Sequence, residues 1–300
     1  MDPGPPRWVQ AARRLPRVRI YGCSRRETPN RSYAVTSLGP CEFFEFTYTD
    51  GTKFVIDHAA HRLWGTFSPP LTFEDFAVYL RGPIMGFILR RRGVIALHAS
   101  ALFPGHAIVL CGPSESGKST TAAAMAIRGI PVLSDDIAAI NTEEVSFQIE
   151  AGYPRICIWP EAVRELLGAT DALPRLTPTW DKRFLPVDGT KAKFKSQKSL
   201  LGGVYLLSPR AVANAPRIEE VSPRQALLEL VQNTYMNWLL NREQRAAEFE
   251  VLSNLVTTVP VRRIVAHIDP ARIAAVCDLI LRDSQSLRNH QGARSWASGR

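Results

Sequence analysis

Residues 107–119 read AIVLCGPSESGKS and set the fold class that we expect of this chain. The apolar run 107–111 predicts a buried strand. A turn-rich segment with two glycines follows, and residues 119–128, STTAAAMAIR, are strongly helix-forming and end at Gly129. A strand, a glycine-bearing loop and a helix thus follow one another directly, as in an α/β domain.

The loop between this strand and helix matches the pattern Gly-x-x-x-x-Gly-Lys-Ser, which predicts a nucleoside triphosphate site. Its residues are Gly112, Pro113, Ser114, Glu115, Ser116, Gly117, Lys118 and Ser119, and we add Thr120 as the next residue of the helix. Glycines let backbone N–H groups converge on phosphate oxygens, and the helix N-terminus supports the same anion. Lys118 is expected to reach the β- and γ-phosphates, and the Ser119 hydroxyl to bind Mg²⁺. The loop alone selects no reaction, because motors, transporters, GTPases and kinases share it.

Two adjacent carboxylates narrow the set of reactions that the loop could serve. Asp135 and Asp136 follow the loop helix at the end of a candidate strand. A strand–loop–helix–strand unit brings that end back to the loop, where one carboxylate could hold Mg²⁺ and the other accept a proton. A polar strand end or a doubled helix cap is the alternative. The chain has no Leu-Ser-Gly-Gly-Gln signature of ABC-type ATPases and no Asn-Lys-x-Asp base reader of translational GTPases.

A histidine precedes the loop on the neighbouring candidate strand. His98 lies in Leu97-His98-Ala99-Ser100, within the apolar residues 94–103. Such a side chain can assist proton transfer or contact phosphate near neutral pH. Alone, a histidine in an apolar strand is more often a core residue with satisfied hydrogen bonds.

Together these residues resemble the catalytic domain of HPr kinase/phosphorylase. The resemblance rests on Leu-His-Ala-Ser at 97–100, on the loop at 112–119 and on Arg-Gly-(x)5-Asp-Asp at 128–136. It spans residues 93–140 most clearly and extends towards 210. The same pattern is similar to distant relatives of that enzyme, among them kinases of lasso-peptide gene clusters, which are thought to phosphorylate a precursor peptide.

This resemblance implies a fold, a reaction and residue roles. The fold is an α/β P-loop kinase domain with a mixed sheet of the phosphoenolpyruvate carboxykinase/HPr kinase type. The reaction uses ATP and Mg²⁺ and transfers the γ-phosphate to a serine hydroxyl of a peptide or small protein. By position, Lys118 binds phosphate and Ser119 binds Mg²⁺. Asp135 is the base, Asp136 assists metal and phosphate, and His98 lines the site.

A basic segment beginning at Asp181-Lys182-Arg183 supplies a further candidate. In the relatives a cation at a similar place lies near the nucleotide or the acceptor. We therefore assign Arg183, or its neighbour Lys182, to the nucleotide site, where it would stabilise the charge of the transferred phosphoryl group. A solvated loop is the alternative.

The chain is expected to divide into three parts. Residues 1–70 form a small β-rich part, in which Asp50-Gly51 predicts a hairpin turn. Residues 71–284 form the P-loop domain with a helical C-terminal part, including a long helix from Ser222-Pro223 to about Leu240. Residues 285–300 are polar and are predicted to be a disordered tail.

Composition limits the partners. The net charge of +9, from 37 Lys and Arg against 28 Asp and Glu, suits anionic ligands. The chain has no zinc finger or aromatic RNA-binding signature, so we expect no nucleic-acid partner. It has no apolar stretch of the ~20 residues that a membrane helix needs, and we expect a cytoplasmic protein. The oligomeric state stays open, with a homo-oligomer as one alternative.

Two other functions fit the same residues. A small-molecule kinase also carries acidic residues shortly after the loop helix, although about a hundred residues precede the loop here. A nucleotide-gated binding protein without transfer would use the N- and C-terminal parts for partner recognition. Small hydroxyl metabolites as acceptors would indicate the first, and ATP-dependent complex formation without a phosphoacceptor the second.

Overall fold

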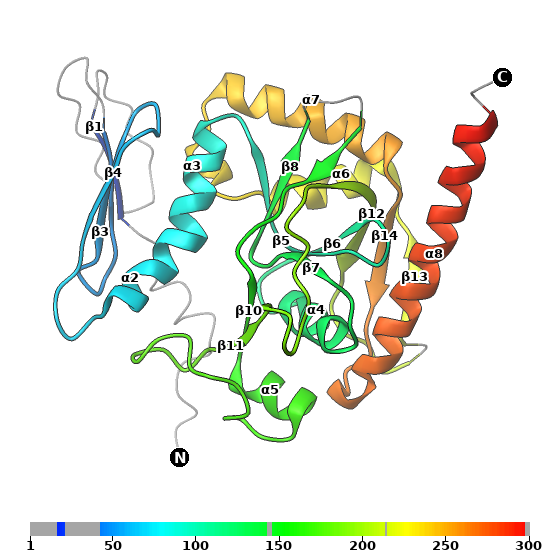
Figure 1. Ribbon diagram of the computed structural model, residues 1–300. Helices are drawn as coiled ribbons and strands as arrows, with labels where there is room; N and C mark the ends of the chain where they lie inside the picture. Colours follow the sequence, from blue (N-terminus) through cyan, green and yellow to red (C-terminus); the bar gives the residue numbers. More distant parts are fainter. Residues whose placement is uncertain (1–16, 22–42, 143–145, 214, 298–300) are drawn as a thin grey trace. The chain divides into compact units, whose positions relative to one another are not determined.

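The computed structural model describes residues 17–21, 43–142, 146–213 and 215–297 of the chain (Figure 1). They belong to two compact units. The first is Met1–Arg92 with Thr177–Thr179, and the second is Gly93–Leu176 with Trp180–Arg300. Residues 1–16 and 22–42 of the expected β-rich part lie outside the described residues.

The first unit contains a four-stranded antiparallel sheet in the order β1-β2-β3-β4. Its strands are β1 (Arg17–Tyr21), β2 (Phe43–Thr47), β3 (Lys53–Asp57) and β4 (Leu63–Thr66). Asp50 and Gly51 make the predicted hairpin turn between β2 and β3: Gly51 has φ +89°, and the Asp50 carboxylate accepts the Thr52 N–H at 2.9 Å. The hairpin prediction is confirmed.

Three short helical segments complete this unit: α2 (Phe73–Tyr79), the π-helical turn η1 (Leu80–Ile84) and α3 (Met85–Arg91). Phe76 of α2 stacks on Phe54 at 4.5 Å between ring centroids, and Phe87 of α3 meets Phe46 edge-on at 4.8 Å. Because these aromatic contacts tie the helices to the sheet, the first unit ends at Arg92 rather than near residue 70.

The second unit is built on a mixed sheet in the order β13-β14-β12-β6-β5-β8-β9, with β7 paired to β5. The central strand β12 runs parallel to β6 and β14, whereas β5 runs antiparallel to β6 and β8. The expected mixed α/β architecture is confirmed. The strands are β5 (Ile95–Leu102), β6 (Ala107–Cys111), β7 (Val132–Ser134), β8 (Ile137–Asn141), β9 (Gln148–Ile149), β12 (Ser199–Leu207), β13 (Arg217–Glu220) and β14 (Val261–Val265). A separate antiparallel pair is formed by β10 (Arg155–Ile158) and β11 (Arg183–Pro186).

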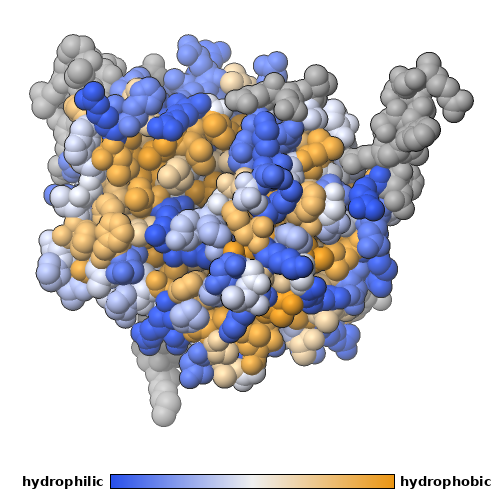
Figure 2. Space-filling view, viewed as in Figure 1, coloured by the Kyte–Doolittle hydropathy of each residue, from blue (hydrophilic) through white to orange (hydrophobic). Residues whose placement is uncertain are grey.

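Helices cover both faces of this sheet (Figure 1). One apolar cluster joins the sheet to α4 (Lys118–Ile127), α5 (Pro160–Leu167) and α8 (Ile273–Ala297). The other joins it to α6 (Pro223–Gln232) and α7 (Arg242–Thr258). The 3₁₀ turns η2 (Asn237–Leu239) and η3 (Pro270–Arg272) precede α7 and α8. Figure 2 shows polar side chains interspersed with apolar areas on the face in view. No helix in the described part of the chain has the length and apolarity to cross a membrane.

Two sequence predictions about helix ends are corrected. The helix from Ser222 ends at Gln232 rather than near Leu240. There the Asn233 and Thr234 side chains bond back to carbonyls of α6, and the Tyr235 N–H joins Ala96 O of β5 at 2.9 Å. The predicted disordered tail is instead helical as far as Ala297, because buried Ser284 and Leu287 prolong the packed face of α8.

Candidate functional site

The loop between β6 and α4 has the backbone that its glycines predict. Gly112 has φ +154°, and a Cβ there would lie 2.8 Å from the carbonyl oxygen of Leu207 on β12. Gly117 has φ +97° and begins α4. A side chain at either position would strain or displace this turn, so the loop keeps its shape because both residues are glycine.

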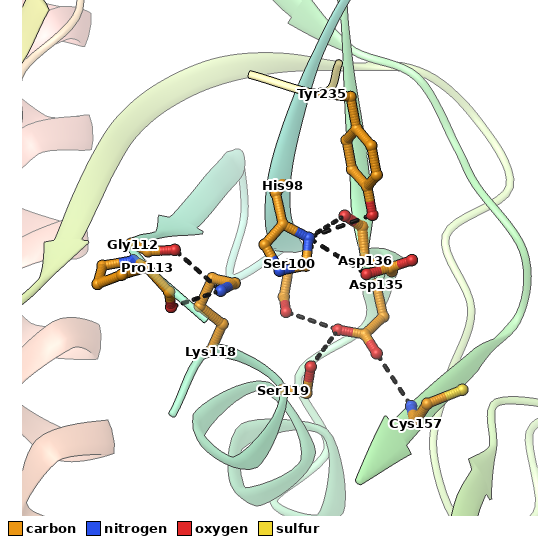
Figure 3. Close-up of polar contacts among 10 residues, drawn as sticks. All are labelled: His98, Ser100, Gly112, Pro113, Lys118, Ser119, Asp135, Asp136, Cys157 and Tyr235. Atoms are coloured by element: carbon orange, nitrogen blue, oxygen red, sulfur yellow. Dashed lines mark hydrogen bonds and ion pairs between the residues drawn. The ribbon is translucent and has the colours of Figure 1, made fainter. Parts of the chain in front are cut away.

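Lys118 is the first residue of α4, and its ammonium lies inside the loop. The side chain is 6% exposed, and Nζ donates to the carbonyl oxygens of Gly112 and Pro113, both at 2.9 Å (Figure 3). Burial lowers the pKa of Lys118, while the Asp136 and Asp135 carboxylates act in the opposite direction. A cation is thus held where the pattern expects a phosphate to bind.

Ser116 adds an orphaned polar atom to the same loop. Its Oγ is buried and has no hydrogen-bond partner among the described residues. Such atoms are rare in folded proteins and suggest that a ligand completes the bonding. The backbone glycines, the buried ammonium and this hydroxyl together fit a polyphosphate.

Asp135 forms hydrogen bonds to the loop helix α4 and to the strands β5 and β10. Its Oδ1 accepts hydrogen bonds from Ser100 Oγ at 2.6 Å and from Ser119 Oγ at 2.9 Å, and its Oδ2 accepts the Cys157 N–H at 2.9 Å (Figure 3). Burial raises the pKa of Asp135, and the bonds from Ser100 and Cys157 partly offset that rise. The contact with Ser119 brings the acidic pair to the loop, as the order of strand and helix predicts.

Asp136 faces a different set of groups. His98 Nδ1 lies 3.2 Å from Asp136 Oδ1 and 3.2 Å from the Tyr235 hydroxyl (Figure 3). Burial acts to raise the pKa of Asp136, but it is outweighed by the hydrogen bond and charge of His98 and by the charge of Lys182, which lower it. The side chain is 46% exposed. Asp136 is therefore an ionised carboxylate open to an incoming group.

Asp136 also adopts a strained backbone. Its φ is +71°, a left-handed conformation that non-glycine residues seldom adopt. This conformation turns the two neighbouring carboxylates towards different partners, Ser119 for Asp135 and His98 for Asp136. Strain of this kind concentrates at functional sites.

The basic segment at 181–183 contributes through Lys182. Its charge acts on Asp136 and Lys118, and its Nζ lies 5.1 Å from the centroid of the Trp159 ring. Arg183 lies on β11 opposite Ile158 of β10, and its Nε is buried with no hydrogen-bond partner among the described residues. Ser114 and Glu115 of the loop are exposed.

Tyr235 and Ser100 are members of the site that the sequence motifs do not single out. Ser100 stands two residues after His98, at the end of the segment Leu97-His98-Ala99-Ser100. Tyr235 comes from the irregular segment after α6, far from every motif in the sequence. An alternation rule applied to β5 would have placed Ser100 on the same side as His98. Nothing local in the sequence points to Tyr235.

The donor atoms fit Mg²⁺ bound together with a nucleotide. The Ser119 hydroxyl and the two aspartates offer oxygen ligands, which Mg²⁺ prefers. Among the described residues there is no group of three or more His, Cys, Asp or Glu side chains that could hold a metal ion.

No protein-family model matches the chain, and no curated protein matches it. Among solved structures, a partial match is the Hpr(Ser) kinase/phosphatase from Coxiella burnetii, with 12% sequence identity and a TM-score of 0.38. The match covers 67% of this chain and 97% of that chain. The likeness is too low to assign a family or an activity, so the chemistry below rests on this chain's own residues.

Proposed function

We propose that this protein is an ATP-dependent kinase that transfers the γ-phosphate to a serine hydroxyl of a peptide or small protein. The hydrogen bond from Ser119 to Asp135 carries the proposal, because it unites a phosphate-loop pattern with an acidic pair. The resemblance to HPr kinase/phosphorylase supports the choice of acceptor. Binding and positioning by the loop, with charge neutralisation, would supply most of the rate.

The hydrogen bonds favour a different division of roles between the two aspartates from the one that the resemblance implies. The Asp135 carboxylate already accepts hydrogen bonds from Ser119, Ser100 and Cys157. It is therefore suited to orienting the loop hydroxyl and the metal. Asp136 is partly exposed beside His98 and makes no hydrogen bond to the loop hydroxyl, so its position suits removal of the proton from the acceptor hydroxyl.

The remaining groups bind and orient. Lys118 and the loop N–H groups would hold the triphosphate, and Lys182 would add positive charge near Asp136. Tyr235 and His98 would keep the Asp136 carboxylate in place. Mg²⁺, held by Ser119 and Asp135, would neutralise charge that develops on the phosphates.

The first prediction distinguishes the roles of Asp135 and Asp136. Asp136→Asn is expected to lower phosphoryl transfer by about 10²-fold or more while MgATP affinity stays unchanged, because a base is lost and not a binding group. Asp135→Asn is expected to weaken MgATP binding, because Ser119 loses its partner. Mass spectrometry measures transfer to HPr and to short serine peptides, and calorimetry measures affinity.

The reverse pattern, with lost transfer and intact affinity in Asp135→Asn, would return the base role to Asp135. Bound ATP with no mass gain of one phosphoryl group on any peptide or protein would reject the proposed acceptor. Screening small hydroxyl metabolites would then test a small-molecule kinase.

A further inference from the structure

The antiparallel pair β10–β11 has one face in the core of the second unit and one face outside it. Ile156, Ile158 and Leu185 of this pair are buried in that core. Alternate residues of a strand point to opposite faces, so Arg155 and Cys157 share the other face of β10. Both are only partly buried. We call this the outward face of the pair.

The outward face begins at the candidate catalytic site. The Cys157 N–H donates to Asp135 Oδ2 at 2.9 Å, as Figure 3 shows. Burial raises the pKa of the Cys157 thiol to about 11, and the positive charges of Arg155 and Lys182 act against that rise. Both cations therefore lie close enough to act on a residue that contacts the acidic pair.

The Arg155 guanidinium has no polar partner among the described residues. Its Cζ lies 5.1 Å from the centroid of the Tyr153 ring, which is 49% exposed, and it forms no ion pair or hydrogen bond with any of them. Three other arginines of the second unit each pair with a carboxylate: Arg128, Arg217 and Arg263. A guanidinium held against a ring in this way can bind a carboxylate that a ligand supplies.

We infer that Arg155, supported by Tyr153, is a specificity-determining residue that binds an acidic side chain of the acceptor peptide. This inference rests on the proposed function, because it needs an acceptor serine at Asp136. Arginine binds a carboxylate through two parallel, charge-assisted hydrogen bonds, so a neutral amide in its place should bind less well.

The strand spacing predicts where the acidic residue stands in the peptide. Arg155 lies two residues before Cys157, which is about 7 Å along β10 at ~3.3 Å per residue. An extended peptide advances by the same distance per residue, so the acidic side chain should lie about two to four positions from the serine.

The test compares synthetic peptides that differ in one residue. Each has a single serine in an alanine–glycine background, with Glu, Gln or Lys at one position within about four residues of the serine. Mass spectrometry measures kcat/KM for transfer from MgATP to each peptide by the full chain. We expect the best Glu peptide to exceed its Gln counterpart about tenfold, mainly through a lower KM. Because Arg155 is partly exposed, added salt should reduce this ratio.

Substitutions of Arg155 assign the preference to its charge. Arg155→Gln should bring the Glu-to-Gln ratio to within about a factor of two of one, and Arg155→Glu should favour the Lys peptide over the Glu peptide. Lys191→Glu makes the same reversal of charge at an exposed position outside β10 and β11 and should keep the preference of the parent chain. Calorimetry of MgATP binding reports whether each variant is folded.

Three results would overturn the inference. A Glu-to-Gln ratio near one in the parent chain, or a preference that survives in both Arg155 variants, would do so while the proposed function stands. An equal loss of preference in Lys191→Glu would assign the effect to the overall charge of the chain. Transfer to none of the peptides, with MgATP bound, would reject a peptide acceptor and, with it, the inference.

Discussion

At the scale of single residues, the phosphate loop depends on the buried ammonium of Lys118. Lys118→Ala removes the cation inside the loop and its two bonds to carbonyl oxygens. Hydrogen bonds to charged groups contribute about 1.5–3 kcal/mol, so ATP should bind roughly 10- to 100-fold more weakly in calorimetry. Lys191→Ala removes an equal charge from an exposed position and should leave the affinity unchanged. Equal affinities in the two variants would contradict a phosphate role for Lys118.

His106 gives the free energy of unfolding a pH dependence. The ring is 6% exposed, and neither ring nitrogen has a hydrogen-bond partner among the described residues. Burial, and next the charge of Arg288, lower the pKa of His106 below its ordinary 6.5. Below pH 6.5 the unfolded chain therefore binds a proton at His106 that the folded chain does not bind. The free energy of unfolding falls as the pH falls towards the folded pKa.

Urea unfolding at a series of pH values from about 5 to 8 measures this effect. His106→Leu should flatten the dependence below pH 6.5, because the folded and unfolded states then bind the same number of protons at this position. A slope identical to that of the parent chain would show that other groups cause the dependence.

The site residues that the sequence predicts are those carried by a contiguous motif. Lys118 and Ser119 follow from the loop pattern, and Asp135 from the length of one helix between two strands. Tyr235 could not be predicted, because it reaches His98 through the irregular chain after α6. Its backbone bond to Ala96 is a long-range contact that no local propensity encodes.

At the scale of elements, strong local signals gave accurate boundaries. Apolar 107–111 is β6, and the helix predicted at 119–128 is α4 (Lys118–Ile127). Errors arose where tertiary contacts decide the outcome. The polar composition of 285–300 indicates disorder, yet Leu287 in that segment is buried beside Gly203 of β12.

The extension of α8 should matter for stability. Leu287 is 9% exposed, and a Cβ on Gly203 of β12 would lie 3.2 Å from its Cδ1. Leu287→Ala should lower the free energy of unfolding by about 2 kcal/mol, through lost burial and a cavity. Leu228→Ala, at a 54% exposed position of α6, is the matched control and should cost much less. Equal losses in denaturant titrations would mean that α8 does not pack on the sheet at Leu287.

At the scale of the whole molecule, the two units have separate cores. Both apolar clusters of the sheet in the second unit draw their residues from 95–281, and the aromatic core of the first unit centres on Phe46 and Phe54. A fragment of residues 93–300 should therefore fold and bind ATP with the affinity of the full chain. Circular dichroism and calorimetry measure this.

Phe54→Ala in the full chain supplies the complementary measurement. It should destabilise the first unit by about 3–5 kcal/mol and leave ATP affinity unchanged, because no residue of the loop belongs to that unit. Loss of ATP binding in both the fragment and the variant would show that the first unit is required for the nucleotide site.

The left-handed backbone of Asp136 has a consequence for evolution in the laboratory. A glycine adopts φ +71° without the penalty that an aspartate bears. Asp136→Gly would relieve this strain but would also remove the carboxylate that interacts with His98 and Lys182, so selection for heat resistance alone weighs one effect against the other. A library screened for activity as well should retain the aspartate at this left-handed position, because the glycine variant lacks the proposed base.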